Sequence, residues 1–264
     1  MLKSLKLWSR ALAIAFLVLL FFPFQWLAIR FNFSWRRHLP VFFHRMACRI
    51  IGLRVTVIGQ PTVGRALMLV SNHVSWLDIL VLGSVGPLSF IAKAEVASWP
   101  AFGFLARLQG TVFIDRTRKA DTQSVNKAVA ARLQRGDVMV LFAEGTTGDG
   151  TRILPFRSAL LGAARDAAGA TSIVDVQPVS LSYPKRGGLP LTATNRANEI
   201  AWVGDIELLP NLIGILTGLP VDAVVRFGDA LPFGPATNRK IMTRTLETSV
   251  RQLTATTLRG RDGL

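Results

Sequence analysis

The sequence contains a single cysteine and few acidic residues. Because Cys48 has no partner in the chain, an internal disulfide framework and a cysteine-rich metal site are both excluded. The 31 lysines and arginines outnumber the 16 aspartates and glutamates, so the formal net charge is +15. Charged residues make up only 18% of the 264, below the roughly 25% of an average soluble domain, and the mean hydropathy is +0.38. A disordered or fibrous protein is therefore excluded, and a water-soluble nucleic-acid binder would normally be more polar.

The longest uncharged run lies near the N-terminus, at 11–29. As a helix it is just long enough to cross about 30 Å of hydrocarbon. Basic residues flank the run on both sides and give no orientation. Pro23 interrupts it, which favours a pair of helices dipped into one leaflet slightly over a single span. The next segment, 35–53, mixes cations with apolar residues as interfacial helices do. We predict a membrane-associated helical arm over 1–50 and an α/β body over 51–264.

A cleaved signal peptide is a weaker interpretation of the same run. Its apolar core is too long, and no small-residue cleavage site follows it before the cations. The basic excess is then explained most simply by attraction to anionic lipid headgroups. Membrane lipids are accordingly the expected partners, and no nucleic acid is expected.

The body alternates short apolar runs with amphipathic stretches, which is the pattern of an α/β domain. Strands are expected at 54–59, 66–71, 111–115, 137–143 and 172–183. Helices are expected at about 122–135, with Gly136 at the C-terminal cap, and at 157–168. The apolar segment 208–220 is broken by proline and glycine. It predicts either a second lipid-contacting surface or a buried helix, and the two interpretations are equally supported.

Of the three histidines, only His73 lies in the body, whereas His38 and His44 belong to the arm. His73 directly follows the strand at 66–71, at the edge where open α/β sheets bind ligands. Ser75 and Asp78 have the spacing of a capping box, so Ser75 is expected to be the N-cap of a helix. With His73 in the preceding loop, the Asp78 carboxylate can reach its ring, leaving the other nitrogen to accept a proton from a hydroxyl. Alternatively, Asp78 only complements the helix dipole and His73 binds a backbone carbonyl.

Two further segments place polar residues at strand ends, 110–116 and 142–147. Taken singly, Arg116 is more simply a surface cation paired with Asp115, and Glu144 a turn or N-cap acid. The sequence lacks the zinc-binding HExxH, the nucleophile elbow GxSxG, the phosphate loop GxxxxGK[ST] and the dinucleotide fingerprint GxGxxG. A base without an evident protein nucleophile indicates direct attack by a substrate hydroxyl, and no metal site is expected.

Together the blocks NHVSWLD, GTVFIDR and FAEGTT, followed by VQPVS, resemble the 1-acylglycerol-3-phosphate acyltransferase family over about 70–179. The resemblance implies an α/β fold with a mixed, largely parallel sheet, flanking helices and a lipid-embedded N-terminus. It also implies that His73 and Asp78 form the catalytic pair. The substrate site that it implies comprises Asn72, Ser75, Gly110, Phe113, Ile114, Asp115, Arg116, Glu144, Gly145, Thr146 and Pro178.

The third block departs from the family's usual FPEGTR, because Ala143 replaces the proline and Thr147 the arginine. Threonine cannot supply the forked charge that suits a phosphate. The sequence at 144–160 is similar to the lyso-ornithine-lipid acyltransferase branch, yet Arg116, Arg152 and Arg157 could still hold a phosphate. We therefore keep two acceptors, 1-acyl-sn-glycerol-3-phosphate first, giving phosphatidic acid, and lyso-ornithine lipid second.

The family also supplies expectations about donor and location. The donor is a thioester of CoA or of acyl carrier protein, with no cofactor. The location is a membrane, expected to be the bacterial inner membrane with the body on the cytoplasmic side. Two remoter functions remain as alternatives: a non-enzymatic basic protein that binds membranes or nucleic acid, and a lipid esterase that uses water.

Overall fold

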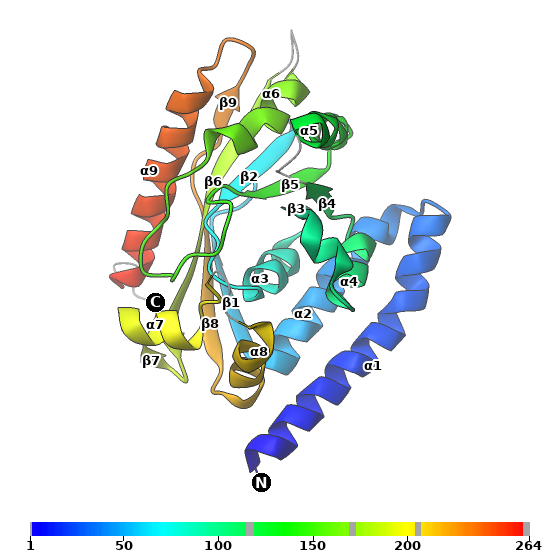
Figure 1. Cartoon of the computed structure of the whole chain (residues 1–264), viewed down its shortest axis with the longest axis vertical. Coiled ribbons are helices and arrows are strands. Elements are labelled where there is room, and N and C mark those ends of the chain that lie inside the picture. The colour runs from blue at the N-terminus through cyan, green and yellow to red at the C-terminus, as the bar shows by residue number, and fades with distance from the viewer. Residues whose placement is uncertain (1, 115–118, 169–172, 204–206, 261–264) are drawn as a thin grey trace.

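The computed structural model describes residues 2–114, 119–168, 173–203 and 207–260, and it is built around one twisted sheet (Figure 1). In chain order the strands are β1 (Leu53–Ile58), β2 (Leu67–Ser71), β3 (Leu88–Lys93), β4 (Val112–Ile114), β5 (Val138–Phe142), β6 (Val174–Arg186), β7 (Leu189–Pro190), β8 (Val221–Phe227) and β9 (Leu231–Phe233). The α-helices are α1 (Leu2–Arg30), α2 (Leu39–Ile51), α3 (Leu77–Val85), α4 (Phe102–Leu108), α5 (Lys119–Gln134), α6 (Gly162–Ala168), α7 (Ala193–Glu199), α8 (Leu208–Thr217) and α9 (Arg239–Leu258). Short 3₁₀ turns occur at η1 (Ser34–Arg37), η2 (Ala94–Ser98) and η3 (Ser158–Leu161).

The sheet has the strand order β1-β8-β6-β2-β5-β3-β4. Strands β4, β3, β5, β2 and β6 run parallel to one another, and β6 is antiparallel to β8. The expected mixed, largely parallel α/β fold is therefore confirmed. Because parallel strands end at the same edge, the residues that follow β2, β3 and β5 all emerge there.

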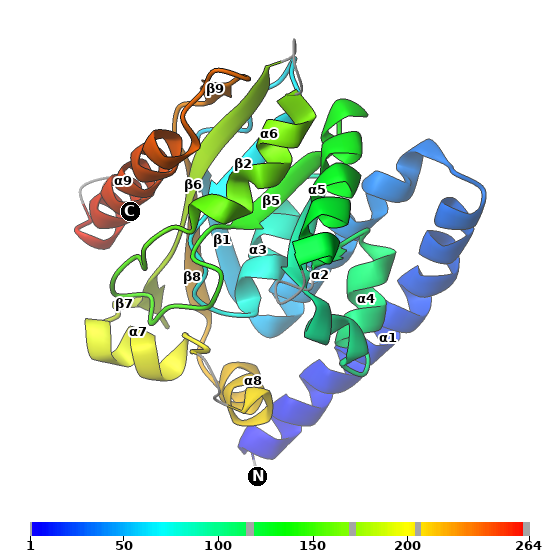
Figure 2. The same cartoon turned by 45° about the horizontal axis from the view of Figure 1, so that its top comes forward.

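Helices cover both faces of the sheet, as the turned view shows (Figure 2). On β2, Leu67 and Leu69 pack in one core with residues of α2, α3 and α8, whereas Met68 and Val70 pack in a second core with residues of α5, α6 and α9. A strand buried on both faces needs apolar side chains at every position, which explains its unbroken LMLV.

The arm differs from the expectation at Pro23. Helix α1 runs unbroken from Leu2 to Arg30 through this proline, so the predicted break there is wrong. Proline removes one backbone bond and normally kinks a helix, but two aromatic contacts hold α1 immediately before this point: Phe21 contacts Phe43 of α2, and Phe22 contacts Phe104 of α4. The helical pair consists instead of α1 and α2, joined through η1.

Helix α1 presents most of its large apolar side chains to the outside. Among the described residues it is the one helix long and apolar enough to cross a membrane, which indicates membrane association. Its largest exposed side chains include Leu5, Trp8, Leu12, Phe16, Leu19, Phe24 and Trp26. Whether the arm at 1–50 and the body at 51–264 fold as separate units stays a prediction.

The segment 208–220 combines the two interpretations that its sequence allowed. Ile215 and Leu216 of α8 are buried in the core, while Leu209 and Ile213 are exposed. Helix α8 lies beside the N-terminal half of α1, where Arg10 Nη1 donates to the Leu216 carbonyl over 2.9 Å. One face of α8 therefore belongs to the core, and the other extends the apolar surface of the arm.

Candidate active site

His73 and Asp78 meet at the loop that follows β2. His73 Nδ1 and Asp78 Oδ2 lie 2.7 Å apart, the contact that their spacing allowed. The same oxygen accepts the backbone N–H groups of Val74, over 2.6 Å, and Ser75, over 3.1 Å. The expected N-cap is wrong, because α3 begins at Leu77 and the Ser75 hydroxyl makes no capping bond. Instead the first-turn carboxylate reaches back and binds the loop's backbone.

The other oxygen of Asp78 binds a residue that the sequence analysis missed. Tyr183, the one tyrosine of the chain, donates its hydroxyl to Asp78 Oδ1 over 2.6 Å, and both side chains are fully buried. Burial, reinforced by the nearby Asp78 charge, raises the pKa of Tyr183 well above its ordinary value, so the phenol stays a donor. Four donors therefore satisfy one buried carboxylate, which holds it in a fixed orientation.

One face of the His73 imidazole is covered by a neighbouring ring, and part of the side chain is open to solvent. Its ring stacks on Phe142, at the end of β5, with a centroid distance of 4.0 Å and an interplanar angle of 15°. The side chain keeps 19% of its surface exposed. With Nδ1 engaged by Asp78, Nε2 has no partner among the described residues. The arrangement suits a base that accepts a proton at Nε2.

Glu144 braces this loop through the backbone. Its Oε1 accepts the N–H of His73 and its Oε2 the N–H of Leu154, both over 2.9 Å. The N–H of Gly148 donates to the His73 carbonyl over 2.7 Å. Residues 144–148 therefore bind both the backbone N–H and the backbone carbonyl of His73. Burial raises the pKa of Glu144 to about 7. Its carboxylate thus acts on the position of His73, and both of its oxygens are already occupied.

Asn72 ties the loop to the neighbouring strand β6. Its Nδ2 donates to the Leu181 carbonyl over 2.9 Å, and its Oδ1 accepts the Leu181 N–H over 2.8 Å. Ser75 is also buried, and its hydroxyl has no partner among the described residues. Gly145 adopts a φ of +75°, which an L side chain rarely adopts, and thereby turns the chain after Glu144; Thr146 follows, half-buried.

Other residues of the predicted substrate site lie elsewhere. Gly110 precedes β4, at the sheet edge opposite His73, and its carbonyl accepts a bond from Arg132. Phe113 lies within β4. Pro178 pairs with Val70 inside the sheet. The structure therefore does not bring Gly110 or Pro178 to the His73 edge, because each occupies a position earlier along its strand. Asp115 and Arg116 lie outside the described residues.

Three cations are candidates for binding the acceptor's headgroup. Lys93, which the sequence analysis missed, is exposed at the end of β3, on the same edge as His73. The sequence does offer a pattern that could have identified it, because a short apolar run typical of a strand ends at this lysine. Arg152 and Arg157 are exposed on the segment after β5, whereas Thr147 is buried. Among the described residues, no group of three or more histidines, cysteines or acids could hold a metal ion.

Comparisons with known proteins identify the family of the chain. Residues 54–182 match the family model described as Acyltransferase. A lyso-ornithine lipid O-acyltransferase of Brucella abortus is 44% identical, covering 99% of this chain and 98% of the relative. Another from Rhizobium meliloti is 42% identical over 92% and 84% of the two chains. A 1-acyl-sn-glycerol-3-phosphate acyltransferase of Neisseria gonorrhoeae is 43% identical, but over 46% and 48% of the chains.

The fold has a solved counterpart. The crystal structure of the 1-acyl-sn-glycerophosphate acyltransferase PlsC from Thermotoga maritima matches with a TM-score of 0.68 over 96% of each chain, at 18% sequence identity. Fold and sequence together define an acyltransferase. The chain belongs to the lysolipid acyltransferase family, whose lyso-ornithine lipid members resemble it over nearly its full length.

Proposed function

We propose that this enzyme transfers a fatty acyl group from a thioester to the free hydroxyl of a lyso-ornithine lipid at a membrane surface. The observation that carries the proposal is the His73–Asp78 pair at the sheet edge, with its 2.7 Å contact and an Nε2 that no described residue binds. Such a pair can deprotonate a hydroxyl without forming an acyl-enzyme.

In the proposed reaction His73 Nε2 takes the hydroxyl proton while the hydroxyl oxygen attacks the thioester carbonyl carbon. Asp78 orients the ring and stabilises the imidazolium that forms. The tetrahedral intermediate collapses as the carbon–sulfur bond breaks, and the departing sulfur receives the proton from Nε2. A positioned base contributes about 10² to 10⁴-fold, and the rest comes from holding thioester and hydroxyl together.

The choice of acceptor rests on Thr147. An ornithine headgroup carries a carboxylate and an ammonium, whereas lysophosphatidic acid presents a phosphate that suits a forked guanidinium. The side chain at 147 is neutral and buried, so it supplies no such group. The relatives from Brucella abortus and Rhizobium meliloti, which are matched over most of their length, are named for lyso-ornithine lipid, and this supports the same choice.

Lysophosphatidic acid is the second candidate acceptor. The exposed Lys93, Arg152 and Arg157 provide positive charge on the segments around the site. The matched part of the Neisseria gonorrhoeae protein, which is named for this acceptor, also favours it.

The arm and the donor complete the proposal. An acyl chain gains about 0.8 kcal/mol per CH₂ buried in a bilayer, so the lysolipid stays in the membrane and the exposed apolar face of α1 brings the enzyme to it. The donor is acyl-CoA or acylated carrier protein. Because such thioesters are cytoplasmic metabolites, we assign the body to the cytoplasmic side of a bacterial inner membrane.

The experiment offers lyso-ornithine lipid and lysophosphatidic acid in parallel to the purified protein in detergent, with a labelled acyl thioester. Labelled ornithine lipid is the expected product, and phosphatidic acid alone would overturn the acceptor assignment. His73→Ala is expected to lower the rate by about 10² to 10⁴-fold. His38→Ala, which removes an exposed histidine of the arm, is the matched control and should retain the rate.

A further inference from the structure

A cationic pocket lies at the sheet edge opposite the catalytic pair. Its volume is about 240 Å³, and its lining combines the turn between α1 and α2 with the residues that precede β3, β4 and β5. The five residues of β5 separate it from the His73 edge by about 16 Å. The proposed acyl transfer does not use this pocket.

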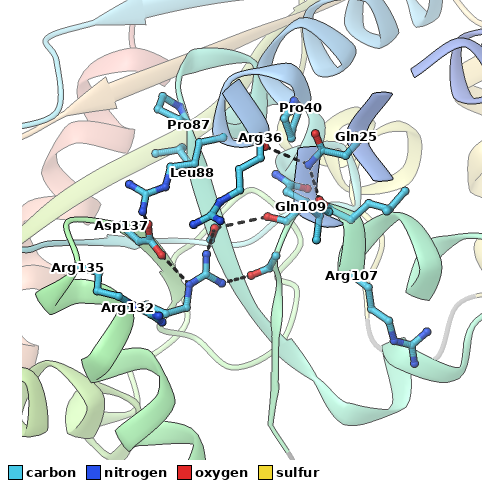
Figure 3. A pocket seen from close by; sticks show the side chains of 15 residues that line it. Gln25, Arg36, Pro40, Pro87, Leu88, Arg107, Gln109, Arg132, Arg135 and Asp137 are labelled. Atoms are coloured by element: carbon cyan, nitrogen blue, oxygen red, sulfur yellow. Dashed lines mark hydrogen bonds and ion pairs between the residues drawn. The ribbon is translucent and has the colours of Figure 1, made fainter. Parts of the chain in front are cut away.

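The pocket gathers five arginines against one acid. Figure 3 shows Arg36, Arg132 and Arg135 on the side where Asp137 lies, while Arg107 points away. Asp137 pairs with Arg132 over 2.8 Å and also with Arg37, another lining residue, over 2.7 Å. Asp137 binds two arginines but carries only one negative charge. The five arginines therefore leave the pocket with a large excess of positive charge.

Arg36, Arg107 and Arg135 have no acidic partner among the described residues, but Arg107 and Arg135 each donate to a backbone carbonyl. The Arg36 guanidinium makes no hydrogen bond or ion pair with any described residue, although its backbone carbonyl accepts a bond from Gln25 Nε2. By contrast, Arg132 binds Ser89 Oγ and the Gly110 carbonyl as well as Asp137. Arg107 is occupied by the Ala97 carbonyl and the Phe113 ring. The unused forked donor points to an anion such as a phosphate.

The surroundings distinguish a lipid phosphate from a soluble one. Arg36 lies in η1, next to the stacked and exposed rings of Phe33 and Trp35, which are 5.6 Å apart. Phe31 is also exposed just before them. Aromatic rings of this kind favour the headgroup region of a bilayer, where the phosphates of anionic lipids lie.

We propose that this pocket, centred on Arg36 and closed by Arg37, Arg132 and Arg135, binds the phosphate of an anionic phospholipid headgroup. The lipid is a bound component of the membrane-associated enzyme and is not consumed. The site fixes the turn of the arm at the membrane surface, independently of which lysolipid is the acceptor.

The test titrates the full-length protein in neutral detergent with short-chain phosphatidylglycerol, followed by calorimetry. Phosphatidylcholine of equal chain length, inorganic phosphate and CoA are titrated separately. Arg36→Gln and Arg135→Gln each remove one pocket cation. Arg49→Gln is the matched control, because Arg49 is exposed on α2 of the same arm but does not line the pocket.

The expected result is saturable binding of phosphatidylglycerol that each pocket variant weakens about fivefold or more, while Arg49→Gln leaves it unchanged. Equal losses in all three variants would mean diffuse surface attraction and would overturn the site. Binding of phosphate or CoA that depends on Arg36, without binding of phosphatidylglycerol, would overturn the lipid assignment. Acyl transfer in detergent at saturating substrate should be unchanged in Arg36→Gln, so a failure here is separable from failure of the proposed reaction.

Discussion

Tyr183→Phe removes the hydroxyl that binds Asp78 of the His73–Asp78 pair and leaves the aromatic ring in place. In the native protein this hydroxyl is the donor to Asp78 Oδ1, at 2.6 Å in a fully buried position. A hydrogen bond to a charged group contributes about 1.5–3 kcal/mol. We expect the free energy of unfolding to fall by about that amount, since Oδ1 is left buried without a donor.

The effect on catalysis should be smaller than that of removing His73. Asp78 Oδ2 keeps its bonds to the histidine ring and to two backbone N–H groups, so the pair still forms. The carboxylate nevertheless loses one of its fixing contacts, and it orients the imidazolium less firmly. A loss of about 1.4 kcal/mol of transition-state stabilisation corresponds to a tenfold lower kcat. The KM for donor and acceptor should not change, because Tyr183 contacts neither.

The assay measures denaturant unfolding by tryptophan fluorescence and the rate of labelled acyl transfer on the same preparation. Ser180→Ala is the matched control, because Ser180 is also buried on β6 but its hydroxyl bonds Thr254 of α9 over 2.8 Å. That control should lose about 0.5–1.5 kcal/mol of stability and keep its kcat. An unchanged kcat in Tyr183→Phe, or an equal loss in both variants, would refute a positioning role for the phenol.

Glu144→Gln should lower the free energy of unfolding by about 1–3 kcal/mol, because an amide cannot accept both backbone N–H bonds. Since burial raises the pKa of Glu144 from 4.5 to about 7, the native state binds more protons between these values; stability should therefore fall as pH rises through them, and this slope should be absent in the variant. Thr147→Arg should raise the ratio of lysophosphatidic acid to lyso-ornithine lipid acylated in competition by about tenfold, and an unchanged ratio in a folded variant would contradict the role of residue 147. Leu12→Asp with Phe16→Asp should reduce sedimentation with lipid vesicles, since each apolar side chain contributes about 1.5–3 kcal/mol when buried; Ile241→Asp, at 63% exposure against their 66% and 67%, should not.

Much of the fold could be predicted from the sequence, because the local hydrophobic pattern agrees with the burial of each segment in the folded protein. The unbroken apolar run before His73 is a strand buried on both faces, and its end at the sheet edge follows from the parallel topology. The spacing of His73 and Asp78 likewise restricted how their side chains could meet. Strands β3 and β8 and helix α9 were missed: β8 carries Asp222 and Arg226 within its apolar run, and α9 carries scattered threonines that obscure its periodicity.

The rest of the site depends on contacts between distant parts of the chain. Tyr183 is 105 positions from Asp78, and nothing in its own neighbourhood in the sequence distinguishes it from a core tyrosine. Gly110 is the opposite case, a residue that was predicted to belong to the site and does not lie there. The family motif that contains it suggested a place near His73. Gly110 instead precedes β4, and the parallel pairing of β3 with β4 places it at the edge opposite His73.

The hydrogen bonds around His73 also indicate which residues can discriminate between the two candidate acceptors. Within the NHVSWLD segment, Asn72 binds β6, and the N–H groups of Val74 and Ser75 bind Asp78. These groups are engaged with β6 and with Asp78, and Asn72 and Ser75 are buried, so they are poorly placed to recognise a headgroup. Discrimination between an ornithine and a phosphate must then come from the neighbouring strand ends, where Lys93 and Thr147 lie. Substitutions inside the segment should therefore lower the rate for both acceptors alike, whereas substitutions at those two positions should change their ratio.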